Sequence, residues 1–191
     1  MEKIDFLEPD YFYHIYNRGN NKENLFTEET NYFHFLKLLT IHISEIADVY
    51  SYCLLKNHFH LVIKIKSKEC LNEKRIDKLH QPFSNLFNAY TKAYNKMYNR
   101  EGSLFKVRFK RVRITSIDYL INVILYIHLN PIKHKFAENF EVYAYSSYQS
   151  LLSTKPTQLK RKEVLELFGD LDHFIYVHKQ ALLEGHYEEF D

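Results

Sequence analysis

The strongest constraint on the fold is an alternation of apolar and other side chains along residues 58–66. The first set is Phe59, Leu61, Ile63 and Ile65, and the second is His58, His60, Val62, Lys64 and Lys66. Because successive side chains of a strand point to opposite faces of a sheet, this segment predicts a strand with one buried face. His58 and His60 then project together from the other face. Such a pair can bind a metal ion or can be hydrogen-bonded inside a core.

The order of the other elements defines a fold class. We expect strands at residues 11–18, 49–55, 58–66 and 105–114, and helices at about 27–46 and 82–99. Strand, helix, strand, strand, helix, strand is the order of a ferredoxin-like (βαββαβ) antiparallel sheet with its helices on one face. The sequence therefore predicts an α+β fold, in which the face that carries the histidines is free of these two helices.

A further helix is expected from Ser116, whose side chain can cap it, through Tyr126 towards Pro131. Tyr126 and Asn130 are four residues apart and share a face of this helix, whereas His128 points away. Asn130 should lie in the last turn, because a residue before proline disfavours helical backbone. A tyrosine that anchors a core and an asparagine that caps the helix would explain both residues without any chemistry.

Charge is distributed unevenly along a chain whose formal net charge is only +2. Residues 102–135 contain seven Lys or Arg and one acid, a net charge of +6, whereas residues 155–191 contain five bases and eight acids, a net charge of −3. The densest group of bases is Lys106, Arg108, Lys110, Arg111 and Arg113. A basic strand of this kind is typical of a surface that binds a polyanion, and an ordinary solvated surface can give the same pattern.

Composition limits the class of protein. A chain of 191 residues with 46% hydrophobic and 26% charged residues is typical of one globular domain with an extension. The first residues lack the basic head and apolar run of a signal peptide, and the apolar runs are too short to span a membrane. Two cysteines cannot form a disulfide framework and lack metal-ligand spacing. We therefore expect a soluble cytoplasmic protein with no membrane partner.

Four separated blocks of this sequence resemble the REP-associated tyrosine transposases, a branch of the single-tyrosine HUH transposases. The blocks are YHIYNRGNNKENLF, LLKNHFHLVI, GSLFKVRFKRVRI and YLINVILYIHLNPIKHKF, the last followed by YSSY. They have the order and spacing of the family and cover roughly residues 11–148. The resemblance implies a transposase domain at residues 1–150 and a helical C-terminal extension at residues 151–191, with an added catalytic helix beside the ferredoxin-like sheet.

The resemblance also implies a set of site residues. His58 and His60 would be metal ligands, and the side-chain amide of Asn130 would be the third ligand, where the insertion-sequence branch has Gln. Tyr126 would be the catalytic nucleophile. The implied ion is Mg²⁺ or Mn²⁺, because two imidazoles and an amide with open positions do not close a structural zinc site. Lys106, Arg108, Lys110, Arg111 and Arg113 are the candidates for contacts to the DNA backbone.

The implied activity is cleavage and rejoining of single-stranded or hairpin DNA through a 5′-phosphotyrosine intermediate. A conjugative relaxase or replication initiator would share this chemistry. A non-catalytic single-stranded nucleic-acid-binding module would explain the basic strand, with Phe105 and Phe109 stacked on bases or packed in the core. A two-histidine phosphoesterase is disfavoured, because only one H-x-[ST] motif, at residues 42–44, is present. The oligomeric state stays open between monomer and homodimer.

Overall fold

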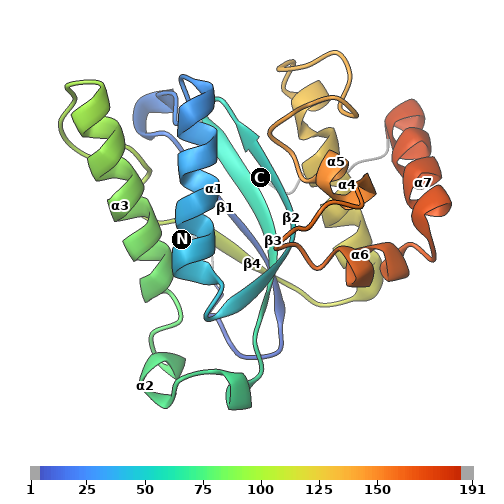
Figure 1. Ribbon diagram of the computed structural model, residues 1–191, viewed down its shortest axis with the longest axis horizontal. Coiled ribbons are helices and arrows are strands. Elements are labelled where there is room, and N and C mark those ends of the chain that lie inside the picture. The colour runs from blue at the N-terminus through green and yellow to red at the C-terminus, as the bar shows by residue number, and fades with distance from the viewer. Residues whose placement is uncertain (1–4, 186–191) are drawn as a thin grey trace.

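The computed structural model describes residues 5–185 and contains a four-stranded antiparallel sheet (Figure 1). The strands are β1 (Phe12–Arg18), β2 (Ala47–Leu55), β3 (His58–Ile65) and β4 (Lys110–Ile114). They lie in the order β2-β3-β1-β4, and each neighbouring pair is antiparallel. This is the order of a ferredoxin-like sheet, so the predicted α+β fold class is confirmed.

Helices α1 (Glu29–Ile43) and α3 (Gln81–Met97) cover one face of the sheet (Figure 1). The apolar side chains of β3 point into the core beneath these helices, together with Tyr13 and Ile15 of β1. Each buried side chain of this size stabilises the fold by roughly 1.5–3 kcal/mol relative to exposure. The predicted alternation along β3 is therefore observed, with its apolar members under α1 and α3.

Three short elements complete this half of the chain. They are the 3-10 turns η1 (Asn20–Lys22) and η2 (Lys68–Cys70) and the helix α2 (Glu73–Ile76). Of these, η1 follows β1 directly, so it lies at the end of the sheet where His58 begins β3. This turn therefore belongs to the surroundings of the histidines.

Helix α4 (Ile117–Lys133) begins at Ser116, whose side chain accepts a hydrogen bond from the backbone N–H of Tyr119. Every side chain from Val123 to Pro131 is buried, so α4 needs neighbours on two sides. One neighbour is the second face of the sheet, over β2 and β3. The face that carries the histidines is therefore partly covered by α4 and is not left free of helices. None of the helices between residues 5 and 185 is long and apolar enough to cross a membrane.

The other side of α4 packs against the C-terminal helices α5 (Tyr148–Leu152), α6 (Arg161–Leu167) and α7 (Leu171–Glu184), which lie beside it in Figure 1. Phe168 and Phe174 are buried in the same core as α4. The expected helical extension is therefore present and docked. Side chains from both sides of the predicted boundary at residue 150 share this core, and the boundary itself stays a prediction.

A chain of buried hydrogen bonds joins α7, α4 and β2. His178 Nδ1 lies 2.7 Å from the Phe174 carbonyl, which can only accept, so this nitrogen donates. His178 Nε2 then accepts from His128 Nδ1 at 2.8 Å, and His128 Nε2 accepts from the Ser147 hydroxyl at 2.8 Å. The Ser147 oxygen in turn accepts from the Tyr52 N–H at 2.9 Å. All these groups are satisfied with both imidazoles neutral, and His128 faces α7, as its helical spacing predicts.

The buried histidines predict a loss of stability in acid. Burial lowers the pKa of His178 to about 4, whereas an unfolded histidine has a pKa of about 6.5. The unfolded state therefore binds more protons between these values, and the free energy of unfolding falls as pH falls through this window. For His178 alone we expect a loss of about 2 kcal/mol between about pH 7 and about pH 5.

Urea unfolding at the two pH values measures this loss. The His178→Gln variant, whose side chain does not titrate, should lose less free energy than the wild type over the same interval. Because the comparison is between two differences, a lower stability of the variant at neutral pH does not affect it. Equal losses would contradict the assignment of His178 as a neutral buried base.

Candidate active site

The site begins with the pairing of β1 and β3. Tyr16 lies opposite His60 in β3 and opposite Lys110 in β4, and Arg18 lies opposite His58. Since Tyr13 and Ile15 point into the core under α1 and α3, the alternating residues His14 and Tyr16 lie on the histidine face. Neither residue was predicted as part of the site from the sequence. Their alternation was visible, but the pairing that brings them beside His60 was not.

His60 is held by a second histidine. The Nε2 atom of His14 lies 3.0 Å from Nδ1 of His60, both side chains are buried, and the rings stack. This contact orients the imidazole so that its Nε2 is turned away from His14. Burial lowers the pKa of His60 well below its usual value, and the nearby His14, His58, His134 and Lys133 lower it further. His60 is therefore a neutral imidazole, which is the form that binds a metal ion.

Tyr126 lies over these histidines. Its ring is edge-on to His60, with centroids 5.5 Å apart and planes at 89°, and 6.2 Å from the ring of His14. Lys133, two helical turns later, places its Nζ 4.8 Å from the Tyr126 ring centroid. The structure thus brings the predicted nucleophile and one predicted ligand together. The Tyr126 side chain is fully buried, with an exposed fraction of 0%.

Asn130 lies one turn after Tyr126 on the same helix, in the last turn of α4 as predicted. Its Nδ2 donates to the backbone carbonyl of Tyr126 at 3.2 Å. Its Oδ1 is buried and has no hydrogen-bond partner within the part of the chain that the structure describes. A buried amide oxygen in this condition costs roughly 1–3 kcal/mol, and an amide oxygen is also a common cation ligand.

The predicted ligand set fits a divalent cation by its chemistry. The rings of His58 and His60 lie 5.1 Å apart, and Asn57 Oδ1 holds Nδ1 of His58 at 2.7 Å. Within residues 5–185, no three His, Cys, Asp or Glu side chains are grouped as a metal site would group them. The two imidazoles and the Asn130 amide are the donor set that the sequence predicts, and their role as ligands stays a prediction.

A pocket of about 650 Å³ opens at this end of the sheet, and His58, His60 and His134 form part of its wall. Five bases line it: Arg18, Lys22, Lys106, Arg108 and Lys110. Three of these were predicted as DNA-contacting residues, and the pocket brings them beside the histidines. Three other lining residues were not predicted from the sequence: Arg18, Lys22 and His134. The signals were there, since Arg18 and Lys22 flank a polar turn and His134 follows the tyrosine by about two helical turns.

Arg111 and Arg113 do not line this pocket. They alternate with Lys110 along β4 and lie on its other side. Arg111 Nε donates to the Asp5 carbonyl at 2.7 Å, and Arg113 pairs with Glu8 and lies 3.2 Å from the centroid of the Tyr11 ring. Their contact with DNA stays a prediction, but it would occur on another surface.

Phe105 and Phe109 have exposed fractions of 5% and 9% and lie in the core under α3. Of the two alternatives open for these rings, the structure favours packing over base stacking. Strand β4 begins at Lys110 and not at residue 105, where Phe105 forms only an isolated bridge with Gly19.

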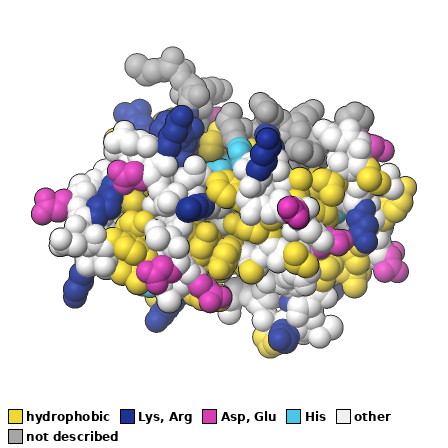
Figure 2. All heavy atoms as spheres, turned by 90° about the horizontal axis from the view of Figure 1, so that it is seen from above, with side chains coloured by type: hydrophobic (Ala, Val, Ile, Leu, Met, Phe, Trp, Pro, Cys, Tyr) yellow, Lys and Arg dark blue, Asp and Glu magenta, His cyan; other side chains and the backbone are white. Residues whose placement is uncertain are grey.

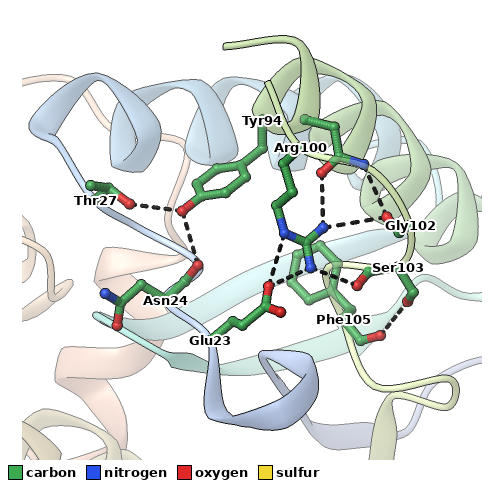
Figure 3. A network of polar contacts seen from close by, with 9 residues as sticks. Glu23, Asn24, Thr27, Tyr94, Arg100, Gly102, Ser103 and Phe105 are labelled. Atoms are coloured by element: carbon green, nitrogen blue, oxygen red, sulfur yellow. Dashed lines mark hydrogen bonds and ion pairs between the residues drawn. The ribbon is translucent and has the colours of Figure 1, made fainter. Parts of the chain in front are cut away.

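We call the five bases that line the pocket its basic rim: Arg18, Lys22, Lys106, Arg108 and Lys110. They lie in or next to two loops, one after β1 and one before β4, which contact each other (Figure 3). Arg100 forms an ion pair with Glu23 and donates to the Ser103 carbonyl at 3.0 Å. The N–H of Lys106 donates to the carbonyl of Arg18 at 3.0 Å. One guanidinium therefore joins the two loops that present the bases, in the network that Figure 3 shows.

Comparison with known proteins places this fold and site in context. No family model matches the chain. A provisionally named REP-associated tyrosine transposase of Haemophilus influenzae is 29% identical over 98 residues, which are 50% of this chain and 56% of that protein. The match therefore spans little more than half of the relative's length.

A solved structure of a REP-associated tyrosine transposase bound to a REP hairpin has a TM-score of 0.65. The structural alignment covers 82% of this chain and 88% of the transposase chain, at 14% sequence identity. The likeness therefore shows a shared fold. The sequence match and the shared fold are therefore both to REP-associated tyrosine transposases. The predicted resemblance is confirmed.

Gly19 provides a test of the rim's construction. Its N–H donates to the Asn57 carbonyl at 2.8 Å, and a Cβ at this position would lie 2.0 Å from the Glu23 carbonyl oxygen. Gly19→Ala must therefore move the backbone after β1, and we expect a loss of about 2–3 kcal/mol in urea unfolding. Gly169→Ala is the control, since its Cβ meets only a side-chain atom at 3.8 Å and its main cost is its positive φ, about 1 kcal/mol. A smaller loss at Gly19 than at Gly169 would contradict the close approach.

Proposed function

We propose that this homologue of REP-associated tyrosine transposases is a metal-dependent single-stranded DNA transposase. It would cleave and rejoin DNA hairpins through a 5′-phosphotyrosine intermediate. The observation that carries the proposal is the position of Tyr126 over His60, 5.5 Å between ring centroids, beside a pocket lined by five bases. The relative whose structure holds a REP hairpin supports a DNA hairpin as the substrate.

The pocket would hold the backbone of the strand. Arg18, Lys22, Lys106, Arg108 and Lys110 line the same pocket as the histidines, so they can neutralise phosphates next to the scissile one. Lys106 and Arg108 are exposed, as a first contact for an incoming strand requires. These contacts fix the position of the strand without reading its sequence.

Two residues outside the proposed ligand set, Asn57 and His14, orient the imidazoles of the proposed cation site. A bound Mg²⁺ or Mn²⁺ would neutralise the charge that develops on the scissile phosphate oxygens. His58, His60 and the Asn130 amide are its proposed ligands. Asn57 and His14 fix the orientation of the two imidazoles, as outer partners of metal-binding histidines do.

Tyr126 would attack the phosphorus through its phenolic oxygen, in line with the departing 3′ oxygen. The strand then ends in a free 3′-OH, and the 5′ phosphate stays on the tyrosine. Attack by another 3′-OH on this ester would rejoin DNA without a high-energy cofactor. The Lys133 ammonium near the ring favours the negative charge that the oxygen carries when it acts as a nucleophile.

The full burial of Tyr126 favours one second candidate, a single-stranded nucleic-acid-binding module without chemistry. Such a module would need only the basic pocket. In the transposase, the side chains over Tyr126 or α4 itself must move before the hydroxyl can reach a phosphate, as gated active sites commonly do. A test for a covalent adduct separates the two candidates.

Tyr126→Phe should abolish the covalent adduct between the protein and a family-type DNA hairpin in Mn²⁺, because it removes only the attacking oxygen. Hairpin affinity and the free energy of unfolding should change little. His60→Ala should also lose cleavage, by about 100-fold or more, while Tyr126 is still present. A denaturing gel with labelled DNA measures both effects.

Tyr119→Phe is the matched control on the same helix and should retain the adduct. An adduct that persists in Tyr126→Phe would assign the nucleophile to another tyrosine. If the wild type forms no adduct while it binds the hairpin tightly, the binding-module candidate is correct.

The basic rim predicts a steep dependence of hairpin affinity on salt. Replacement of Lys106 and Arg108 by alanine should reduce the slope of log affinity against log salt by roughly 0.7–0.9 for each phosphate that is no longer neutralised. The same substitution of Arg111 and Arg113 removes equal charge from the other side of β4 and should change the slope less. Fluorescence anisotropy over a salt series gives the slopes. Equal effects of the two pairs would show that the pocket is not the principal DNA-binding surface.

A further inference from the structure

Helix α4 ends in a motif that fixes the next side chain. The Phe136 N–H donates to the Pro131 carbonyl at 2.8 Å, and the Lys135 N–H donates to the Ile132 carbonyl at 3.0 Å. Lys135 has a φ of +58°. These are the two bonds and the left-handed residue of a Schellman motif. The hydrophobic residue at the position of Phe136 usually packs back on the helix, but here 37% of its surface is exposed.

Phe136 is directed into the basic pocket. It lines the same cavity as Lys106, Arg108 and His58, and its ring centroid lies 6.4 Å from that of His58. The other aromatic ring in the wall, Tyr16, is stacked on His60. An exposed aromatic ring among bases is the combination with which proteins hold unpaired nucleotides, since the ring stacks on a base while the cations hold its phosphates.

We infer that Phe136 is a base-stacking residue, on which one unpaired base next to the scissile phosphate lies. The inference rests on the proposed function for the strand and adds a nucleotide subsite to it. The pocket of about 650 Å³ has the volume of a small-ligand site and can admit one nucleotide.

The subsite should accept different bases. Two asparagines in the pocket wall could read the edge of a base, but the side-chain oxygens of both are engaged by the protein. Asn17 donates to the Lys106 carbonyl and accepts from the Arg18 N–H, and the Asn57 oxygen holds His58. Stacking without edge recognition is tolerant of sequence, because every base has a π face.

The test uses a hairpin oligonucleotide with a thymidine single strand on each side, and a series in which one flanking nucleotide at a time is abasic. All proteins carry Tyr126→Phe, so that binding is measured without cleavage. With Phe136 present, one abasic position should weaken binding about tenfold, and another base at this position should restore it. With Phe136→Ala the intact hairpin should already bind about tenfold more weakly, and the abasic position should cause no further loss.

Two more variants separate stacking from other effects. Phe136→Trp should retain the dependence on the base, whereas Phe136→Leu, which keeps apolar volume without a ring face, should lose it. Phe33→Ala removes an exposed ring on α1, away from the pocket, and should behave as the parent protein. The inference is overturned if no abasic position weakens binding, or if Phe136→Ala keeps the same dependence. Neither result would contradict Tyr126 as the nucleophile. Conversely, the absence of a covalent adduct would not affect this binding test.

Discussion

The antiparallel pairing of β1 with β3 is the interaction on which the rest of the structure depends. It places Tyr16 opposite His60 and Arg18 opposite His58, while the apolar residues between them close the core under α1 and α3. A shift of one residue in this register would move every side chain of one strand to the opposite face of the sheet, including its apolar side chains. The buried apolar face therefore specifies the polar one, on which His14 contacts His60.

Helix α4 converts this polar face into a site because it is buried on two sides. Its sheet side brings Tyr126 to the histidines, and its outer side places His128 against His178 of α7. The C-terminal helices therefore support the helix that carries the proposed nucleophile. The view in Figure 2, at right angles to that of Figure 1, shows hydrophobic, basic and acidic side chains intermingled on this face of the molecule. This mixture is ordinary for a protein surface, and the face that Figure 2 shows carries no broad patch of one charge.

Local patterns predicted much of this molecule. Alternation predicted β3 and the direction of His58 and His60, and helical spacing predicted that Tyr126 and His128 point opposite ways. What failed was long-range. The sequence did not show that α4 would cover the second face of the sheet. The burial of α4 on both sides depends on packing against the sheet and against helices that come later in the chain. The strand expected from residue 105 begins only at Lys110, and alternation along it, which is a local pattern, places Lys110 and Arg111 on opposite sides.

If Tyr126 is the nucleophile, it forms a covalent bond with a DNA 5′ phosphate, and peptide mapping can locate that bond. The wild-type protein is incubated with a DNA hairpin and Mn²⁺, digested with nuclease and trypsin, and analysed by tandem mass spectrometry. Trypsin should release residues 114–133 as one peptide, and fragmentation separates its two tyrosines, Tyr119 and Tyr126. We expect a nucleotide 5′-phosphate on Tyr126. A nucleotide on any other tyrosine, or an unmodified peptide from a protein that has cleaved the hairpin, would contradict it.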